Sequence, residues 1–442
     1  MKMIQEKNVV IALLIVSLLL QLGYMIVYES PINLEYGSDS EQYIHLAKNV
    51  LSGKGYVIDR RGDVLAQNTY YDKSMEKPTA FRLPSYPLFL AGIFLLSQSY
   101  KLVYLFQIGL VLIMFFMFYR IARKFLNHTT ALICLGLLII WPVYICFSTQ
   151  IMSEILGCFL LTSIIYILSF KEGYRWMLLI GFLSAAAVLT RAEFFLLFPI
   201  LLIFSFFKKG LKTASILFII FVLCLSPWIA RNYIVFDKFI PISTQSGEGI
   251  YFGTLPYNPD IQDQGGIVIP YYFSLVNSSI SETEISDALT KAAIENIKTN
   301  SIGVAKNKLH NFFIHWIMPY RINVFDSGQY NEYVSKIKFF DRFIKSGSIG
   351  HKLFKYGYWG FWIFIWLSGF LSIIINIKNK RLWGLFILSL FPLIVGIFVG
   401  FGERSLIPFF PFILMLACYL WLKNENWNFR GRIEWTYDSK QP

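Results

Sequence analysis

Acidic and arginine side chains recur at the ends of apolar segments, where an apolar protein has least reason to place a charge. At these segment ends they are Glu154, Arg191, Glu193, Arg231, Glu403 and Arg404, and the polar loop after the first apolar segment adds Asp39, Glu41 and Arg82. A carboxylate can take a proton as a general base, and arginines bind phosphate through paired hydrogen bonds. Together the two residue types suit a reaction at a phosphate-bearing substrate.

Composition places these residues in a membrane protein. The chain has 442 residues, of which 56% are hydrophobic and only 15% charged. A soluble fold of this length needs more charge on its surface. The net charge of +13 comes from short Lys and Arg clusters at the ends of apolar segments, which indicates membrane topology and not nucleic-acid binding. All five cysteines lie in apolar stretches, so neither a disulfide framework nor a metal cluster is indicated.

Apolar windows predict an all-α polytopic protein with about ten transmembrane helices. The windows are 9–27, 100–119, 129–147, 151–169, 176–191, 193–207, 212–230, 359–377, 382–400 and 405–422. The first window is too long for the apolar region of a signal peptide and lacks a small-residue cleavage site. We therefore expect it to be a retained span.

Basic residues predict the orientation of these spans. If the N-terminus is cytoplasmic, the turns near positions 120–124, 171–175, 208–212 and 378–381 face the cytoplasm as well, and each carries Lys or Arg. The basic C-terminal tail agrees with this arrangement. We expect an integral protein of a bacterial plasma membrane, with both termini inside and the active site outside.

Two long segments remain on the outer side. The first loop, about 28–99, is the predicted catalytic loop, and the second loop, 231–357, forms a separate subdomain with short amphipathic helices. The chain then divides into an N-terminal membrane module (1–230), the second loop, and C-terminal membrane helices with a cytoplasmic tail (358–442). Within the second loop, Ser281 and Glu284 have the spacing of a helix capping box.

Asp39 and Glu41 open an amphipathic run in the first loop that Gly53 and Gly55 end. The spacing predicts a short helix with both acids in its first turn. A structural explanation stays open here, because Ser38 or Asp39 could simply cap the helix.

Each of the other charges also has a structural alternative. Arg191 and Glu193 could be the polar tip of a hairpin, Arg231 could reach to the interface, and Glu154 could cap a helix or pair with an arginine. By the predicted topology, however, all of them lie at the outer ends of spans. Together with Asp39 they predict a polar cavity that suits a phosphate.

Six segments in order resemble the GT-C membrane glycosyltransferases, in the branch of protein O-mannosyltransferases and the lipid A aminoarabinose transferase. The segments are DSEQYIHLAKNVLSGKGY, PTAFRLPSYPLFLAGIF, STQIMSEILGCFLL, GFLSAAAVLTRAEFFLLFP, LSPWIARNYIVFDKFIPISTQSGEGIYFG and GERSLIPFFPFIL. The resemblance implies a GT-C-type fold.

The resemblance also implies roles for individual residues. Asp39, four positions before Tyr43, looks like the family's catalytic aspartate. Arg82 and Tyr86 lie in a segment similar to the family's R-P-P-G-Y-P, although Leu83 and Ser85 replace a proline and a glycine. The arginines of the implied donor-phosphate site are Arg82, Arg191, Arg231 and Arg404. Further site candidates are Glu41, Tyr43, Tyr86, Glu154 and Asn232.

The implied activity is an inverting transfer of a sugar from a polyprenyl-phosphate donor to an acceptor hydroxyl on a glycolipid, polysaccharide or protein. No metal is demanded, because arginines can neutralise the leaving phosphate, although a divalent metal stays an alternative. A flippase or other transporter of lipid-linked sugars is the alternative function, and a non-catalytic interaction protein is a third. Motifs of Walker nucleotide sites, zinc proteases and serine nucleophile elbows do not occur in the sequence, and we expect no nucleic-acid partner.

Overall fold

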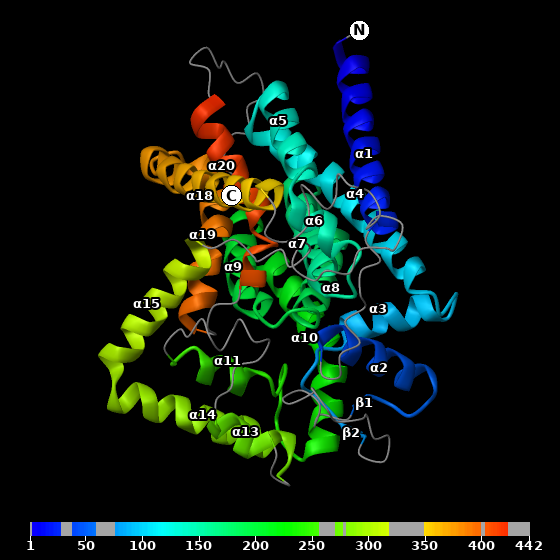
Figure 1. The fold of residues 1–442 in the computed structure, drawn as a ribbon, viewed down its shortest axis with the longest axis vertical. Coiled ribbons are helices and arrows are strands. Elements are labelled where there is room, and N and C mark those ends of the chain that lie inside the picture. Colours follow the sequence, from blue (N-terminus) through cyan, green and yellow to red (C-terminus); the bar gives the residue numbers. More distant parts are fainter. Residues whose placement is uncertain are drawn as a thin grey trace.

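A computed structural model describes residues 2–27, 38–58, 76–255, 270–276, 280–317, 349–398 and 403–422. In these ranges the chain is almost entirely helical (Figure 1). The strands there, β1 (Val57–Ile58) and β2 (Lys77–Pro78), form a short antiparallel ribbon in which Val57 is opposite Pro78.

Apolar helices occupy all the windows predicted to span the membrane. They are α1 (Lys2–Val27), α4 (Tyr100–Phe125), α5 (His128–Ile139), α6 (Pro142–Phe147), α7 (Glu154–Phe170), α8 (Tyr174–Val188), α9 (Phe194–Lys209), α10 (Leu211–Phe236), α18 (Ile349–Asn376), α19 (Trp383–Phe398) and α20 (Phe410–Leu422). Four of the described helices, α1, α4, α10 and α18, are long and apolar enough to cross a membrane. These four helices are compatible with a membrane protein, and the count of ten spans is not confirmed.

Proline explains one departure from the predicted spans. The window 129–147 is divided into α5 and α6, because Pro142 at the start of α6 has no N–H to continue the preceding helix.

The window 405–422 also differs from a single helix. A 3₁₀ turn (Glu403–Leu406) covers its start, and α20 begins only at Phe410. The helix α10 crosses position 230 and α18 crosses position 357 without interruption, and the three-part division of the chain stays a prediction.

The core lies where α20 packs against α18 and α5. Aromatic rings fill this contact: Trp141 stacks on Phe410 and on Trp362, with ring centroids 4.4 and 5.5 Å apart. Every residue of α20 from Phe410 to Tyr419 is buried. This core fixes the start of α20, and with it the 3₁₀ turn that carries Arg404.

The first loop forms helices α2 (Asp39–Leu51) and α3 (Ser85–Phe94), which lie at the opposite end of the molecule from the N-terminus (Figure 1). The predicted helix is confirmed. Its cap is Ser38, whose Oγ accepts a hydrogen bond from the Glu41 N–H, so the side chain of Asp39 is not needed as a cap. The positive φ of Gly53 ends the helix, as predicted. One face of α2 packs on Tyr86 and Leu90 of α3.

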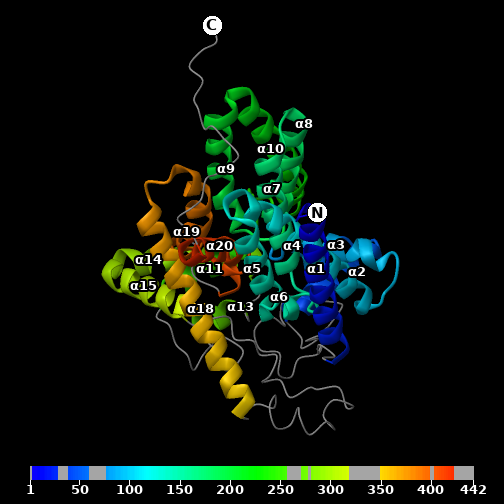
Figure 2. The ribbon, with the colours of Figure 1, turned by 90° about the horizontal axis from the view of Figure 1, so that it is seen from above.

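The second loop contributes α11 (Ser246–Phe252), α13 (Pro270–Val276), α14 (Glu282–Thr299) and α15 (Ser301–Ile317). In Figures 1 and 2, α14 and α15 lie on the flank of the molecule opposite to α2 and α3. The predicted capping box of Ser281 and Glu284 is present at the start of α14.

The two loops are joined through Glu282, the first residue of α14. Its carboxylate accepts hydrogen bonds from the Thr79 hydroxyl (2.7 Å) and from the Ala80 N–H (2.8 Å). The Ser243 hydroxyl, in the same loop, donates to the Phe81 carbonyl at 2.6 Å. These contacts fix the backbone directly before Arg82.

Candidate active site

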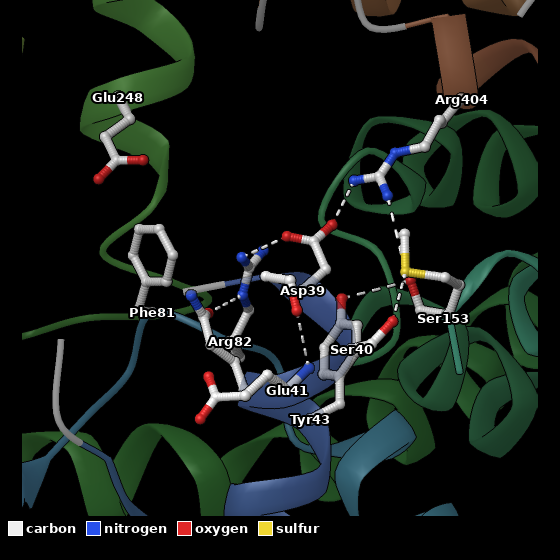
Figure 3. Close-up of polar contacts among 12 residues, drawn as sticks. Asp39, Ser40, Glu41, Tyr43, Phe81, Arg82, Ser153, Glu248 and Arg404 are labelled. Atoms are coloured by element: carbon white, nitrogen blue, oxygen red, sulfur yellow. Dashed lines mark hydrogen bonds and ion pairs between the residues drawn. The ribbon is translucent and has the colours of Figure 1, made fainter. Parts of the chain in front are cut away.

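Asp39 lies between two arginines that come from distant parts of the chain. One carboxylate oxygen accepts a hydrogen bond from Nη2 of Arg82 and the other accepts from Nη2 of Arg404, each at 2.5 Å (Figure 3). The Asp39 side chain is 22% exposed, against 10% for Arg82 and 35% for Arg404. The structure therefore brings the predicted catalytic carboxylate together with two of the four predicted phosphate-binding arginines.

Neighbours on α2 and the adjacent Phe81 fix the position of Arg82. Its Nε donates to Oε1 of Gln42 at 2.5 Å, and its guanidinium lies over the rings of Phe81 and Tyr43. Tyr43 packs edge-on against Tyr86 at 4.9 Å, and the Tyr86 hydroxyl donates to Gln107 on α4 at 2.9 Å. The two site candidates Tyr43 and Tyr86 thus link Arg82 and α2 to α4.

The two arginines control the charge of Asp39. Burial alone would raise the pKa of this carboxyl, but the guanidinium groups of Arg82 and Arg404 outweigh burial and hold the pKa well below its usual range. Burial also raises the pKa of the Tyr43 phenol, so that this hydroxyl keeps its proton at neutral pH. Asp39 is a fully ionised carboxylate, and it is a weak base as long as both arginines hold it.

Glu154 and Arg191 form a second group of charged side chains, and Glu154 pairs with Arg404. Glu154, whose side chain is only 1% exposed, lies 3.3 Å from Nε of Arg404 and 3.0 Å from Nη1 of Arg191. Arg191 also donates from Nε to Glu193 at 2.6 Å. The predicted pairing of Glu154 with an arginine is confirmed. We call Asp39, Arg82, Glu154, Arg191 and Arg404 the Asp39 cluster.

Gly157 allows the side chain of Arg191 to lie close to α7. A Cβ atom placed on Gly157, one turn into α7, would lie only 2.9 Å from Cδ of Arg191. A side chain there would force Arg191 to shift, so glycine at this position favours the contact of Arg191 with Glu154.

Arg231 makes contacts of a different kind. Its Nη1 donates to the Thr79 carbonyl (2.7 Å) and its Nη2 donates to the Tyr56 carbonyl (3.0 Å). Asn232, which is fully buried, donates to the Ile240 carbonyl at 3.1 Å. The described contacts of Arg231 join the start of the second loop to the backbone of the first, and those of Asn232 lie within the second loop. They do not join either residue to Asp39.

Glu41 is buried on α2, and its carboxylate lies 2.8 Å from Nε2 of His45, one turn along the same helix. It therefore has a different partner from Asp39, although the two acids are separated by a single residue. Its role in the site stays a prediction.

Sequence reasoning missed several residues that shape the site. Gln42 orients Arg82, and Glu282 fixes the backbone before it. Glu248 on α11 is a buried carboxylate that accepts from the Tyr272 hydroxyl at 2.7 Å, and Figure 3 places it on the Phe81 side of Arg82. A single acid within the apolar, glycine-rich run SGEGIYFG was a signal for Glu248.

The residues of the Asp39 cluster do not suit a metal ion. Both oxygens of Asp39 face guanidinium groups, whose charge repels a cation. Across the described ranges, no group of three or more His, Cys, Asp or Glu side chains could hold a metal. That the reaction needs no metal stays a prediction.

Comparisons with solved structures agree with the fold. No protein-family model matches the chain, and no curated protein sequence matches it. The crystal structure of the Archaeoglobus fulgidus oligosaccharyltransferase in complex with Zn and sulfate has a TM-score of 0.50 at 15% identity, over 93% of this chain and 48% of that chain. Its apo form has a TM-score of 0.50 at 14% identity, over 93% of this chain and 50% of that one.

This chain spans about half the length of the solved structures it matches. Oligosaccharyltransferases are GT-C enzymes, so the similarity supports the GT-C-like fold implied by the sequence. The particular branch of that class stays a prediction.

Proposed function

We propose that this protein is an inverting glycosyltransferase that uses a polyprenyl-phosphate sugar as its donor. The observation that carries the proposal is the position of Asp39 between Arg82 and Arg404, because it combines a general base with two phosphate-binding groups. The GT-C-like fold supports the same class of reaction. We place the reaction at the outer face of the membrane, on the side of the two long loops.

In the proposed mechanism, the donor phosphate takes over the guanidinium groups that Asp39 occupies without substrate. The donor phosphate is a diester that carries one negative charge, as a carboxylate does, and its two unesterified oxygens accept hydrogen bonds from guanidinium groups. It can therefore replace Asp39 as the partner of Arg82 and Arg404. Once these two contacts weaken, the pKa of Asp39 rises towards its ordinary value. Donor binding thereby activates the base.

The transfer then needs a single displacement. The acceptor hydroxyl oxygen forms a bond to the anomeric carbon while the bond from that carbon to the phosphate oxygen breaks. The acceptor proton passes to Asp39, and the electron pair of the broken bond leaves with the polyprenyl phosphate. Arg82 and Arg404 stabilise the charge that grows on this leaving group.

The remaining cluster residues position Arg404. Glu154 holds its Nε, and Arg191 balances the buried charge of Glu154. An isolated buried carboxylate is costly, so the three side chains depend on one another. We assign Arg191 to positioning and not to direct donor contact. Arg231 contacts none of these side chains in the described structure; it binds the Thr79 carbonyl and so positions the loop backbone before Arg82.

The decisive experiment supplies purified protein in liposomes with a polyprenyl-phosphate sugar labelled in the sugar, and with a mixture of glycolipid acceptors. We expect label in the acceptor and free polyprenyl phosphate in equal amounts. Labelled donor that changes leaflet with its sugar still attached would instead identify a flippase. Asp39→Asn is the control, because it should stop the transfer without removing the protein from the membrane.

A further inference from the structure

A large cavity lies at the end of α1 and α4 that is far from the Asp39 cluster. Its volume is about 980 Å³, and it is a partly open cavity lined by α1, α4, the end of α7 with the turn that follows it, and the end of α9. Figure 1 shows the N-terminal end of α1 and the helix α2 at opposite ends of the molecule. The cavity therefore cannot belong to the site proposed above.

Cations predominate in the lining of this cavity. Six basic side chains, Lys7, Arg120, Arg123, Lys124, Lys171 and Lys209, face two carboxylates, Glu6 and Glu172. Glu6 is already engaged, because it accepts from Arg123 at 2.9 Å and from the Tyr119 hydroxyl at 2.5 Å. The surplus positive charge makes the cavity a site for an anion.

Two of these cations remain available for a ligand. Within the described ranges, no hydrogen bond or ion pair engages Lys7 or Arg120; the Arg120 guanidinium lies over the Phe170 ring, 5.6 Å from its centroid. Lys124, in contrast, donates to the Ser169 carbonyl, and Lys209 donates to the Lys171 carbonyl. Lys7 and Arg120 therefore approach the cavity from two different helices with their charges unpaired.

The other walls of the cavity are apolar and lie deeper along the helices. Ile11 and Leu14 follow Lys7 on α1, and Phe116 precedes Arg120 on α4 by one turn. At a rise of about 1.5 Å per residue, Leu14 is roughly 10 Å further along the helix than Lys7. Ile11 is 45% exposed. The site thus has a charged end and an apolar end, which matches an amphiphile aligned with the helices.

We propose that this cavity binds an anionic phospholipid, with the phosphate at Lys7 and Arg120 and the acyl chains along Ile11, Leu14 and Phe116. The basic turns around the cavity are those predicted to face the cytoplasm, and the cytoplasmic leaflet carries anionic lipids. The inference does not depend on the proposed transferase activity, because the cavity shares no residue with the Asp39 cluster.

The test compares lipid affinities of the full-length protein in detergent by native mass spectrometry, with phosphatidylglycerol and phosphatidylcholine as probes. We expect the wild type to bind phosphatidylglycerol at least tenfold more tightly than phosphatidylcholine. The double variant Lys7→Gln/Arg120→Gln should lose this preference. The matched control, Lys378→Gln/Lys380→Gln, removes the same charge from a basic turn outside the cavity and should keep it.

Three results would overturn the proposal. The first is that the Lys7→Gln/Arg120→Gln variant and the Lys378→Gln/Lys380→Gln control lose the same amount of affinity for phosphatidylglycerol. The second is that the wild type binds the two lipids with equal affinity. The third is competition by glycerol phosphate at concentrations similar to those of the lipid, since that identifies a site for a free anion. If the double variant melts at a lower temperature without lipid, Arg120→Gln alone replaces it, and we then expect at least a threefold loss.

Discussion

Arg404 and Arg231 have similar surroundings in the sequence but different partners in the structure. Each lies at the end of an apolar segment, and each would be read as a phosphate-binding arginine. The Arg404 guanidinium faces the carboxylates of Asp39 and Glu154, whereas the Arg231 guanidinium faces the backbone carbonyls of Tyr56 and Thr79. A guanidinium on an accessible carboxylate can exchange that partner for a phosphate. The Arg231 guanidinium donates to two backbone carbonyls and so stabilises the loop.

The largest effect should come from Asp39. Asp39→Asn keeps the shape of the side chain but removes the proton acceptor, and we expect turnover to fall by about 10² to 10⁴. Donor affinity should not fall and should rise if it changes, because Arg82 and Arg404 remain and no longer face a competing carboxylate. The measurement is the rate of sugar transfer at saturating donor, with binding of labelled donor measured separately.

The matched control is Ser38→Ala, which removes the helix cap next to Asp39 and should cost about 1 kcal/mol of stability with little change in turnover. An Asn variant that transfers sugar at the normal rate would exclude Asp39 as the base. Glu41 and Glu154 would then be the next carboxylates to test.

The next effect separates the two arginines directly. Arg404→Ala should weaken donor binding by about 1.5–3 kcal/mol, roughly 10- to 150-fold, because it removes a charge-assisted hydrogen bond to the phosphate. Arg231→Ala should leave donor affinity nearly unchanged and lower the melting temperature, since the Thr79 carbonyl loses the donor Arg231 and the Tyr56 carbonyl keeps only its bond from the Thr79 N–H among the described contacts. Titration of labelled donor and thermal melting of both variants give the comparison. Equal losses of donor affinity would mean that Arg231 binds the donor as Arg404 does.

A smaller effect is expected at Gly157. Gly157→Ala places a methyl group against Cδ of Arg191, which should cost about 1–3 kcal/mol and disturb the support of Arg404 through Glu154. Transfer rate and melting temperature should both fall. Gly109→Ala on α4 is the control, because a Cβ there meets nothing within 4 Å, and it should stabilise the helix slightly.

The smallest effect is the response to acid. The pKa of Asp39 is lower in the folded protein than the ordinary value of about 3.9. Its ion pairs therefore stabilise the fold above pH 4, and this contribution is lost as pH falls towards the lower folded value. The melting temperature of the wild type should exceed that of Asp39→Asn near neutral pH, and the difference should shrink below pH 4. A difference that stays constant down to pH 2 would contradict the ion pairs.

Local signals in the sequence were enough to predict several elements of the fold. The amphipathic run after Asp39, the stop at Gly53 and the capping box at Ser281 each depend on residues within a few positions of one another. Such signals act through the backbone of a single helix, so they can be read without knowledge of the rest of the chain. Pro142 is an equally local signal for the break within the window 129–147.

The partners of the charged residues could not be predicted in the same way. Whether an arginine meets Asp39 or a carbonyl depends on how α10 and α20 pack, and nothing next to Arg231 or Arg404 in the sequence encodes that packing. The carboxylates of Asp39 and Glu41 are likewise indistinguishable in sequence. On α2 they take different partners, because a step of two residues turns a side chain to another face of the helix.

The separation of the Asp39 partners along the chain has a consequence for biosynthesis. Arg404 follows Asp39 by 365 residues, so translation at about 5–20 residues per second makes Asp39 roughly 20 to 70 seconds before its second arginine. During that interval the nascent protein lacks one of the two guanidinium groups that face Asp39. If the proposed function is right, a chain that stops before Arg404 should be inactive.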